Sequence, residues 1–394
     1  MILEGIAAMQ RNMDFSYFIP SDSCDDVIAT YNAVKQLTKG GRDIYCNESG
    51  TTLRLLLPIA AAMGASVTFH MEKGLYARPM SKLIDELKGH GVMIIKTERE
   101  EEGTYSISGQ LISGEFNLPG DISSQYISGL LMALPLLKGD STVKISGEIS
   151  SYPYVQMTLS SLENSGVTIV ENHTKGDEGT KLIHDLTYVV KGGQTYSHDN
   201  GRIEPDMSAA AYWITAGYIS KKSQLIFGED LNRIIKGEDK TLQGDAKIDW
   251  FLRQMFIDET ALVTLNMDAT PDLTPALAVA AAARMGRTQF RGVQRLKYKE
   301  SNRIESIMNL INGLGGEAVY TEGATEDEDV LTVVGCGGLK GGTVNPYGDH
   351  RIAMAAAIAA LICSESVTIS RPECVNKSYP GFFDEFYRLA HTNL

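Results

Sequence analysis

The feature that most constrains the fold of this chain is an internal repeat. Each copy has a short polar turn, then an apolar helix rich in small residues, then a strand rich in β-branched residues. Five copies begin at Asn47, Asp121, Glu204, Asp272 and Gly348. A helix that is apolar on all sides must be covered on all sides, and a single unit cannot do this alone. The repeat therefore predicts stacked units that share a core.

A second helix follows the first within the repeat. The windows that begin at Arg78, Tyr152 and Ser301 carry apolar residues three and four positions apart, which predicts helices with one buried stripe. Gly315 follows the third of them and is expected to end it in the left-handed conformation. A hairpin closes the unit, as in residues 92–109. Alternating helices and strands predict the α/β class.

The repeat also predicts the domain organisation. The polar stretch 191–206 separates two sets of up to three units each, which gives domains of residues 1–203 and 204–394. The first copy is incomplete. We expect residues 2–9 to be the tail of its inner helix, residues 14–19 its strand, and residues 25–37 its outer helix. Its polar opening is absent, and its closing hairpin is short.

Composition excludes several classes of protein. The net charge of −13 and the lack of a basic run argue against nucleic-acid or anionic-membrane binding. The longest apolar run, from Ile352, has 12 residues, whereas a membrane span needs about 20. The five cysteines lack metal-type spacing and suit free thiols in a reducing compartment. We therefore expect a cytoplasmic protein without a metal site.

The chemistry of the repeat lies at the polar openings of its apolar helices. A helix N-terminus presents free N–H groups and the positive end of the helix dipole, so it favours phosphate and carboxylate groups. If several openings converge, they form an anion site, and a cleft between the domains is the expected place. The polar residues found at these openings are Arg54, Ser123, Ser124, Asp206, Asp272, His350 and Arg351.

Each motif also has a plain structural interpretation. Lys299 and Arg303 lie four apart beside Glu300, and such a cluster is often a solvated helix face. The pair His350–Arg351 opens a helix too apolar for the surface, so an anion is the simplest partner for it. The other motifs also have ordinary structural explanations. Ser123 fits a helix N-cap, and the long stems of Arg54 and Arg78 fit apolar surface with the charged ends in water. Ser151 and Tyr154 fit a cap and aromatic packing, and Lys377 fits a surface lysine.

Nine motifs, in order, resemble those of the 5-enolpyruvylshikimate-3-phosphate synthases. They are ESGTTLRLL, YARP, GDISSQYISGLLMALPLL, SYPYVQMTLSSLENSGV, EPDMSAAAYW, PDLTPALAVAAAA, KESNRIESI, GDHRIAMA and NKSYPGFFDEF. The resemblance implies a two-domain inside-out α/β barrel, the enolpyruvyl transferase fold, built from βαβαββ units with the helix N-termini facing the interdomain cleft. It also implies transfer of the enolpyruvyl group of phosphoenolpyruvate to the 5-hydroxyl of shikimate 3-phosphate, with release of phosphate.

The resemblance assigns roles to residues by position. It places Glu300, Asp272 and Lys299 at the reaction centre, with Glu300 and Asp272 exchanging protons. The implied substrate-binding residues are Gly50, Thr51, Arg54, Arg78, Ser123, Ser124, Gln125, Ser151, Tyr154, Arg303, His350, Arg351 and Lys377. The N-terminal domain would take shikimate 3-phosphate and the C-terminal domain phosphoenolpyruvate. No metal or organic cofactor is implied, and we expect a monomer.

One departure from the family pattern leaves alternatives open. The family begins with a Lys-Ser-x-x-x-Arg segment, whereas the first lysine here is Lys35. We expect the family architecture, with activity that depends on restoring such a segment. A relative that binds shikimate 3-phosphate without turnover is one alternative. A UDP-N-acetylglucosamine enolpyruvyl transferase is another, although no cysteine lies between Cys46 and Arg78. A purely structural repeat protein is disfavoured, because buried cations would be costly.

Overall fold

The computed structural model describes residues 1–100, 102–147, 149–173, 186–197, 203–220, 229–325 and 328–392. The chain separates into two compact units, Met1–Arg202 and Ile203–Leu394, each with its own apolar core. Within the described ranges, no helix combines the length and the hydropathy needed to cross a membrane.

The first unit contains two four-stranded sheets of the same topology. Their orders are β1-β2-β4-β3 and β5-β6-β8-β7, and each joins a parallel pair to an antiparallel hairpin. The strands are β1 (Asp43–Asn47), β2 (Val67–Glu72), β3 (Val92–Glu98), β4 (Glu102–Gly109), β5 (Glu115–Pro119), β6 (Ser141–Ser146), β7 (Ile169–His173) and β8 (Leu186–Val190). The repeated topology is the structural form of the sequence repeat.

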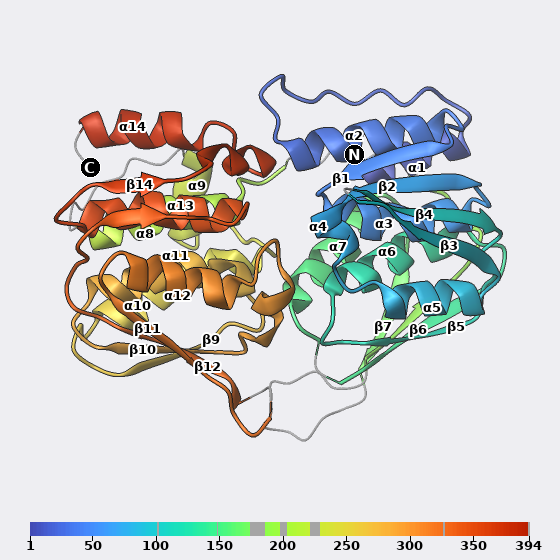
Figure 1. Cartoon of the computed structure of the whole chain (residues 1–394). Helices are drawn as coiled ribbons and strands as arrows, with labels where there is room; N and C mark the ends of the chain where they lie inside the picture. Colours follow the sequence, from blue (N-terminus) through green and yellow to red (C-terminus); the bar gives the residue numbers. More distant parts are fainter. Residues whose placement is uncertain are drawn as a thin grey trace. The chain divides into compact units, whose positions relative to one another are not determined.

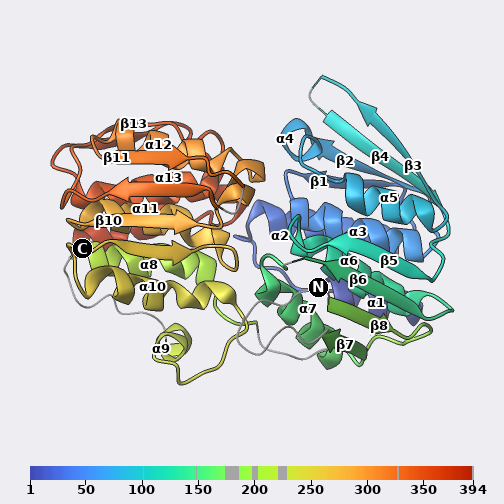
Figure 2. The same ribbon diagram turned by 90° about the horizontal axis from the view of Figure 1, so that it is seen from below.

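Apolar helices form the core of this unit, and amphipathic helices cover it (Figure 2). The helices are α1 (Ile2–Gln10), α2 (Asp25–Thr38), α3 (Gly50–Ala62), α4 (Lys73–Tyr76), α5 (Ser81–Gly89), α6 (Ser124–Ala133) and α7 (Tyr152–Asn164). The inner helices α3 and α6 pack closely at Gly129. A Cβ atom there would lie 2.4 Å from the carbonyl oxygen of Arg54, so only glycine permits this approach.

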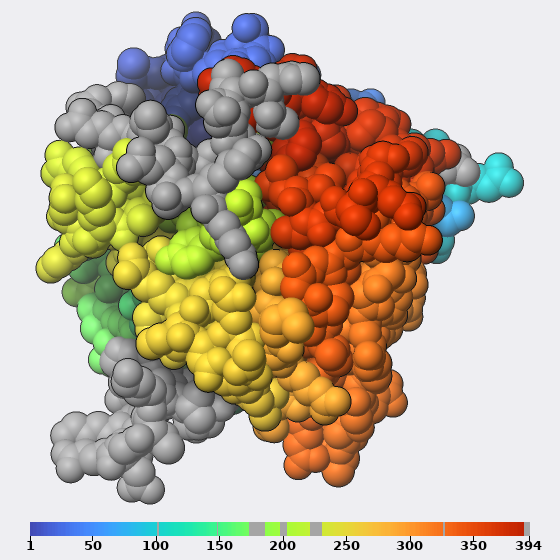
Figure 3. All heavy atoms as spheres, turned by 90° about the vertical axis from the view of Figure 1, so that its left-hand side faces the viewer, coloured from blue at the N-terminus to red at the C-terminus, as the bar shows by residue number. Residues whose placement is uncertain are grey.

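The second unit repeats the arrangement with one four-stranded and one two-stranded sheet, of orders β11-β12-β10-β9 and β13-β14 (Figure 1). The strands are β9 (Val263–Asn266), β10 (Arg287–Arg291), β11 (Glu317–Thr321), β12 (Val330–Val334), β13 (Gly342–Val344) and β14 (Val367–Ile369). The helices are α8 (Met207–Ile219), α9 (Glu229–Ile235), α10 (Ile248–Phe256), α11 (Thr274–Ala283), α12 (Arg303–Gly313), α13 (His350–Ala359) and α14 (Phe382–Thr392). Figure 3 shows the yellow α10 and the red α14 at the surface of this unit.

Most of the predicted elements are confirmed. The three second helices appear as α5, α7 and α12, and Gly315 ends α12 with φ +85°. The inner helices α8, α11 and α13 are buried over nearly their whole lengths. The strand expected after the inner helix of the third copy falls on residues 221–228, which lie outside the described residues, as do 198–202 of the predicted crossover.

The strand predicted at residues 14–19 is wrong. This segment has no regular structure and pairs with no strand in the described part of the chain. A strand needs a neighbour to complete its hydrogen bonds, and residues 14–19 lack one. Instead, the Phe15 ring lies 5.8 Å from the ring of Tyr31 on α2, whereas Phe18 is 85% exposed. Phe15 therefore packs on a helix rather than in a sheet.

A charged cluster joins three strands of the first sheet. His70 on β2 has Nδ1 2.5 Å from Glu102 Oε1 and Nε2 2.9 Å from Asp43 Oδ1, with the Tyr45 ring stacked 4.6 Å away. Carboxylates only accept hydrogen bonds, so both contacts are satisfied only when the imidazole carries two protons. Burial lowers the pKa of His70, but the hydrogen bonds to Asp43 and Glu102 outweigh it and raise the pKa.

This cluster predicts a pH-dependent contribution to stability. Its contribution is fully present below about pH 6.5, the ordinary pKa of histidine, and is lost as the pH rises through the raised pKa of the folded state. We expect the difference in free energy of unfolding between wild type and His70→Gln to shrink with rising pH. Urea titrations followed by circular dichroism measure it, and a difference that grows with pH would contradict this interpretation.

Candidate active site

The second unit gathers acidic and basic side chains around Arg303, the first residue of α12. Its guanidinium is 1% exposed. Nε donates to Asp349 Oδ2 at 2.7 Å, and Nη1 donates to Asp272 Oδ1 at 2.5 Å. Nη2 donates to Glu300 Oε2 at 2.5 Å and to Asp349 Oδ1 at 3.2 Å. Arg303 is therefore the hub of the cluster.

Asp272 is the carboxylate on which the cations converge. It lies in the short helix η3 (Pro271–Leu273), immediately before the apolar helix α11. Besides Arg303, Lys299 Nζ lies 3.1 Å from Oδ1, and Arg351 Nη2 lies 3.5 Å from Oδ2. The structure thus brings together five of the residues predicted for the reaction centre and its surroundings: Asp272, Lys299, Glu300, Arg303 and Arg351.

The protonation states follow from these contacts. Burial raises the pKa of Asp272, but Arg351, Lys299 and Arg303 outweigh it and hold the pKa well below its usual range. Burial lowers the pKa of Lys299, and Asp272 offsets only part of that effect. Burial also lowers the pKa of Arg303, but Asp349, Glu300 and Asp272 more than compensate and raise it. Asp272 is therefore negatively charged and Arg303 positively charged at neutral pH.

Asp349 is a member of this site that the sequence analysis did not single out. Its carboxylate is fully buried, caps α13 by accepting from the Arg351 backbone N–H at 3.0 Å, and accepts from Ser301 Oγ at 3.2 Å. It also holds Arg303 through two hydrogen bonds. Its position before a buried helix is an N-cap signal that could have identified it.

His350, the first residue of α13, is buried, and its Nδ1 has no hydrogen-bond partner among the described residues. Burial and the neighbouring Arg351 lower its pKa to about 4. The imidazole is therefore neutral at neutral pH. The next residue, Arg351, is tied to α8, because the Tyr212 hydroxyl donates to its backbone carbonyl at 3.2 Å.

We predict that His350 makes the second unit sensitive to acid. Because the unfolded chain binds a proton near pH 6.5 and the folded one near pH 4, the stability falls as the pH drops through this window, by on the order of 3 kcal/mol. When the pH falls from 6.5 to about 4, wild type should therefore lose more free energy of unfolding than His350→Gln. Urea titrations at both pH values measure the difference, and equal losses would contradict the prediction.

The first unit carries a second polar cluster at the openings of α3 and α6. Ser49 and Ser123 cap the two helices by accepting from the backbone N–H groups of Thr52 and Gln125. Gln125 bridges the helices, because Arg54 Nη1 donates to its Oε1 at 3.0 Å and its Nε2 donates to Thr51 Oγ1 at 2.8 Å. The predicted residues of these two openings are therefore linked.

Arg78 joins the same region from the chain that follows α4. Its Nη2 lies 3.3 Å from Glu48 Oε2, and Glu48 Oε1 accepts from the Leu75 backbone N–H at 3.3 Å. A Cβ atom at Gly50 would lie 3.2 Å from Arg54 Nη1 and 3.3 Å from Arg78 Nη1. Both guanidinium groups therefore flank Gly50. Glu48 is a residue that the sequence analysis missed, although it lies in the polar opening of its repeat.

The other predicted residues lie at helix ends. Ser124 is buried at the start of α6, and Ser151 is buried before α7 with φ +58°. Tyr154 lies in the first turn of α7, which contacts α6 through a 2.8 Å hydrogen bond between Ser128 and Thr158. Lys377 ends the short helix η7 (Pro372–Lys377), which packs against α13. These positions agree with the repeat, while their contacts with substrate stay a prediction.

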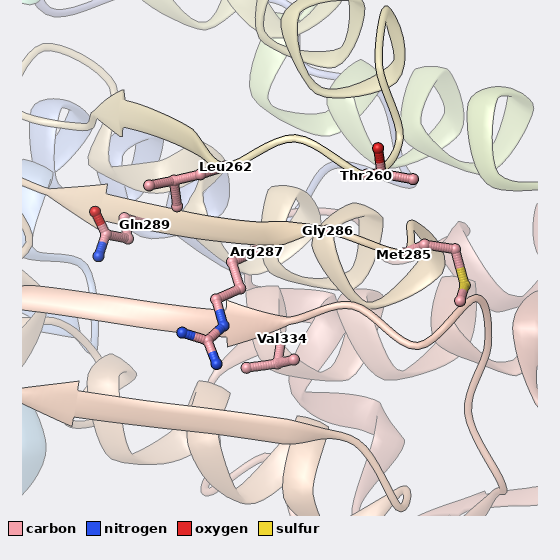
Figure 4. Close-up of a pocket in the computed structure, with 7 residues that line it drawn as sticks. All are labelled: Thr260, Leu262, Met285, Gly286, Arg287, Gln289 and Val334. Carbon is pink, nitrogen blue, oxygen red and sulfur yellow. The ribbon is translucent and has the colours of Figure 1, made fainter.

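A surface depression in the second unit is lined by none of the predicted site residues. Figure 4 labels the side chains around it: Thr260, Leu262, Met285, Gly286, Arg287, Gln289 and Val334. None of them belongs to a helix opening. Among the described residues, no group of three histidine, cysteine or acidic side chains is placed to hold a metal ion.

Comparisons with known proteins identify the family. The family model described as EPSP synthase (3-phosphoshikimate 1-carboxyvinyltransferase) matches residues 19–386. A 3-phosphoshikimate 1-carboxyvinyltransferase of Clostridium kluyveri is 34% identical over 411 residues, covering 96% of this chain and 88% of its own. One of Clostridium acetobutylicum is 36% identical over 383 residues, covering 94% of this chain and 83% of its own.

Solved structures agree on the fold. EPSP synthase from Acinetobacter baumannii matches with a TM-score of 0.62 and 21% identity, over 94% of this chain and 88% of that one. The enolpyruvyl transferase NikO from Streptomyces tendae matches with a TM-score of 0.60 and 17% identity, over 86% and 76%. The predicted enolpyruvyl transferase fold is confirmed, and the family match covers most of the sequence. This chain belongs to the EPSP synthase family.

Proposed function

We propose that this chain transfers the enolpyruvyl group of phosphoenolpyruvate to the 5-hydroxyl of shikimate 3-phosphate and releases phosphate. The observation that carries the proposal is the convergence of Lys299, Arg303 and Arg351 on Asp272, with Glu300 on the same guanidinium. The names of the curated relatives favour this reaction over transfer to UDP-N-acetylglucosamine. They also favour it over a relative without turnover.

The reaction explains why carboxylates and cations lie in contact with one another in the site. The substrate hydroxyl attacks C2 of the enol while C3 takes a proton, and the resulting tetrahedral intermediate then eliminates phosphate. One group must give a proton and another must accept one. We assign these parts to Glu300 and Asp272. The low pKa of Asp272 makes it a weak base in the free protein, and an anionic substrate among the three cations would offset their charge and raise that pKa.

The substrates together bring two phosphates and two carboxylates, whose repulsion needs many cations and N–H donors. We assign the transferred phosphate to Arg78 and Lys377 and the pyruvyl carboxylate to Arg303 and Arg351, with Gly50, Thr51 and Arg54 beside them. The shikimate phosphate falls to Ser123, Ser124, Ser151 and Lys299, its hydroxyls to Gln125 and its ring to Tyr154. In this scheme, shikimate 3-phosphate binds mainly to residues 1–203, and Arg303, Arg351 and Lys377 of residues 204–394 bind phosphoenolpyruvate. Arg78 and Lys299 each bind the substrate of the other domain.

We also infer a cytoplasmic monomer. All five cysteines are free, which suits a reducing compartment. Sedimentation of the purified chain and fractionation of cells test the two parts separately.

The direct test is a phosphate-release assay on the purified chain with both substrates present. We expect phosphate in proportion to the enolpyruvyl product, detected by mass spectrometry. Reactions that lack either substrate serve as controls. Phosphate release without shikimate 3-phosphate would indicate simple hydrolysis. No product with both substrates, whether or not a Lys-Ser-x-x-x-Arg segment is added at the N-terminus, would contradict the proposal.

We predict that Gly50→Ala raises the KM for phosphoenolpyruvate. The new Cβ would lie 3.2–3.3 Å from the Arg54 and Arg78 guanidinium groups, so both would have to shift. A shift of a few tenths of an ångström in two positioning cations should lower kcat/KM by about tenfold. Gly89→Ala on α5 is the matched control, because its Cβ meets nothing within 4 Å. An unchanged KM in Gly50→Ala would contradict the prediction.

A further inference from the structure

The loop between β10 and α12 carries two of the residues proposed for the reaction, Lys299 and Glu300. Its middle forms the short helix η4 (Gln294–Tyr298), in which Leu296 is fully buried. Lys299 follows with an extended backbone (φ −83°, ψ −160°). Because the loop belongs to no sheet, side-chain contacts must determine where Lys299 points.

Lys297, two residues before Lys299, is held by the hairpin β11–β12. Its Nζ lies 3.5 Å from Asp329 Oδ2 and 5.0 Å from the centre of the Tyr320 ring. The Tyr320 hydroxyl donates to Asp329 Oδ2, and the Gly323 backbone N–H donates to Asp329 Oδ1 at 3.0 Å. These contacts connect the end of β11, the hairpin loop and η4 through one carboxylate.

Asp329 is both buried and charged. Its side chain is 4% exposed. Burial raises its pKa, but the hydrogen bonds from Tyr320 and Gly323 and the charge of Lys297 outweigh it and lower the pKa. A buried carboxylate is costly without partners, so Asp329 keeps the Lys297 ammonium in place. An exposed ion pair, by contrast, would contribute little to fixing the position of the Lys297 side chain.

The loop is thus fixed at two points. Lys297 reaches toward the hairpin and Lys299 reaches toward the site, where its Nζ lies 3.1 Å from Asp272 Oδ1. With only Tyr298 between them, movement of Lys297 is transmitted to Lys299 through the backbone. An error of about 1 Å at a positioned catalytic group can cost on the order of 100-fold in rate.

We propose that Asp329, acting through Lys297, is a positioning residue for Lys299. The proposal rests on the proposed function. Tyr320 supports Asp329 in this role by supplying a hydrogen bond to its carboxylate. The sequence offered no sign of it, because Asp329 and Lys297 are 32 positions apart and become neighbours only when the hairpin folds back.

The test compares variants of this chain in the phosphate-release assay at a temperature where all are folded. Lys297→Met is the main variant, because a side chain that is 30% exposed is removed without opening the core. Asp329→Asn and Tyr320→Phe remove the other two partners. We expect kcat/KM to fall about tenfold in Lys297→Met and Asp329→Asn and less in Tyr320→Phe. Lys297→Arg should retain most of the activity.

A double-mutant cycle distinguishes positioning from general stabilisation. If Asp329 acts through Lys299, Asp329→Asn should change kcat/KM by less than about twofold when Lys299→Met is already present. Glu317→Gln, which removes an exposed charge on β11, is the matched control and should leave kcat/KM unchanged. Equal losses from Asp329→Asn with and without Lys299, or full activity in Lys297→Met, would overturn the proposal. Inactive wild type would instead refute the proposed function.

Discussion

Arg303→Met is expected to have the largest effect on this protein. The substitution leaves the carboxylates of Asp272, Glu300 and Asp349 without their common partner. Removing one member of a buried charge cluster costs about 3–5 kcal/mol, because the remaining charges stay desolvated. We expect the second unit to lose free energy of unfolding by that amount and the chain to lose its turnover.

The measurement uses the intrinsic fluorescence of the second unit. Both tryptophans, Trp213 and Trp250, lie in this unit, so urea unfolding followed by fluorescence reports on it. Arg253→Met is the control. It removes a surface arginine whose Nε lies 2.6 Å from Asp249 and whose side chain is 67% exposed, and it should cost less than about 1 kcal/mol. Similar losses in both variants would mean that the cluster around Arg303 is not a desolvated hub.

Lys299→Met should have the second-largest effect, and it should fall on activity rather than stability. Lys299 is partly exposed and supplies one of the three cations on Asp272. Loss of one preorganised charge or donor in an active site typically costs about 10²- to 10³-fold in rate. We expect kcat/KM for shikimate 3-phosphate to fall by that factor, measured by phosphate release, with a free energy of unfolding close to that of wild type.

The same residue predicts the pH dependence of activity. Burial lowers the pKa of Lys299, so its charge is lost at a lower pH than that of an ordinary lysine, near 10.4. The wild-type kcat/KM should therefore decline on the alkaline side before that value, and Lys299→Arg should extend activity to higher pH. Lys340→Met, on a side chain 69% exposed, is the control for loss of a lysine. A tenfold loss of kcat/KM in Lys340→Met would contradict a specific role for Lys299.

Local patterns predicted most of the elements. The inner helices α3, α6, α8, α11 and α13 are apolar on all sides in the sequence and buried in the structure. Ser123 is the predicted cap of α6, and its side chain accepts from a backbone N–H group. Asp206, predicted as a polar residue of another opening, caps α8 in the same way. These features depend on residues within one or two turns of each other, which is why the sequence reveals them.

The segment 14–19 marks the limit of that reasoning. Its composition suits a strand, but a strand also needs a partner, and partners are a property of the whole fold. Glu48, Asp349 and Asp329 were missed for a related reason. Glu48 and Asp349 lie at helix openings, but the sequence does not show which basic residue any of the three contacts. Their partners are far along the chain: Arg78, Arg303 and Lys297.

The sequence by itself determined the repeat, the apolar helices with polar openings, and the candidate anion-binding residues at those openings. It could do so because helix burial and capping are written in short-range patterns of side chains. Only the tertiary structure decided that Arg303 is a buried hub between three carboxylates, and that the hairpin β11–β12 holds the loop of Lys299. Both depend on distances of a few ångströms between residues separated in sequence, and electrostatic energy depends on those distances and on burial rather than on residue type.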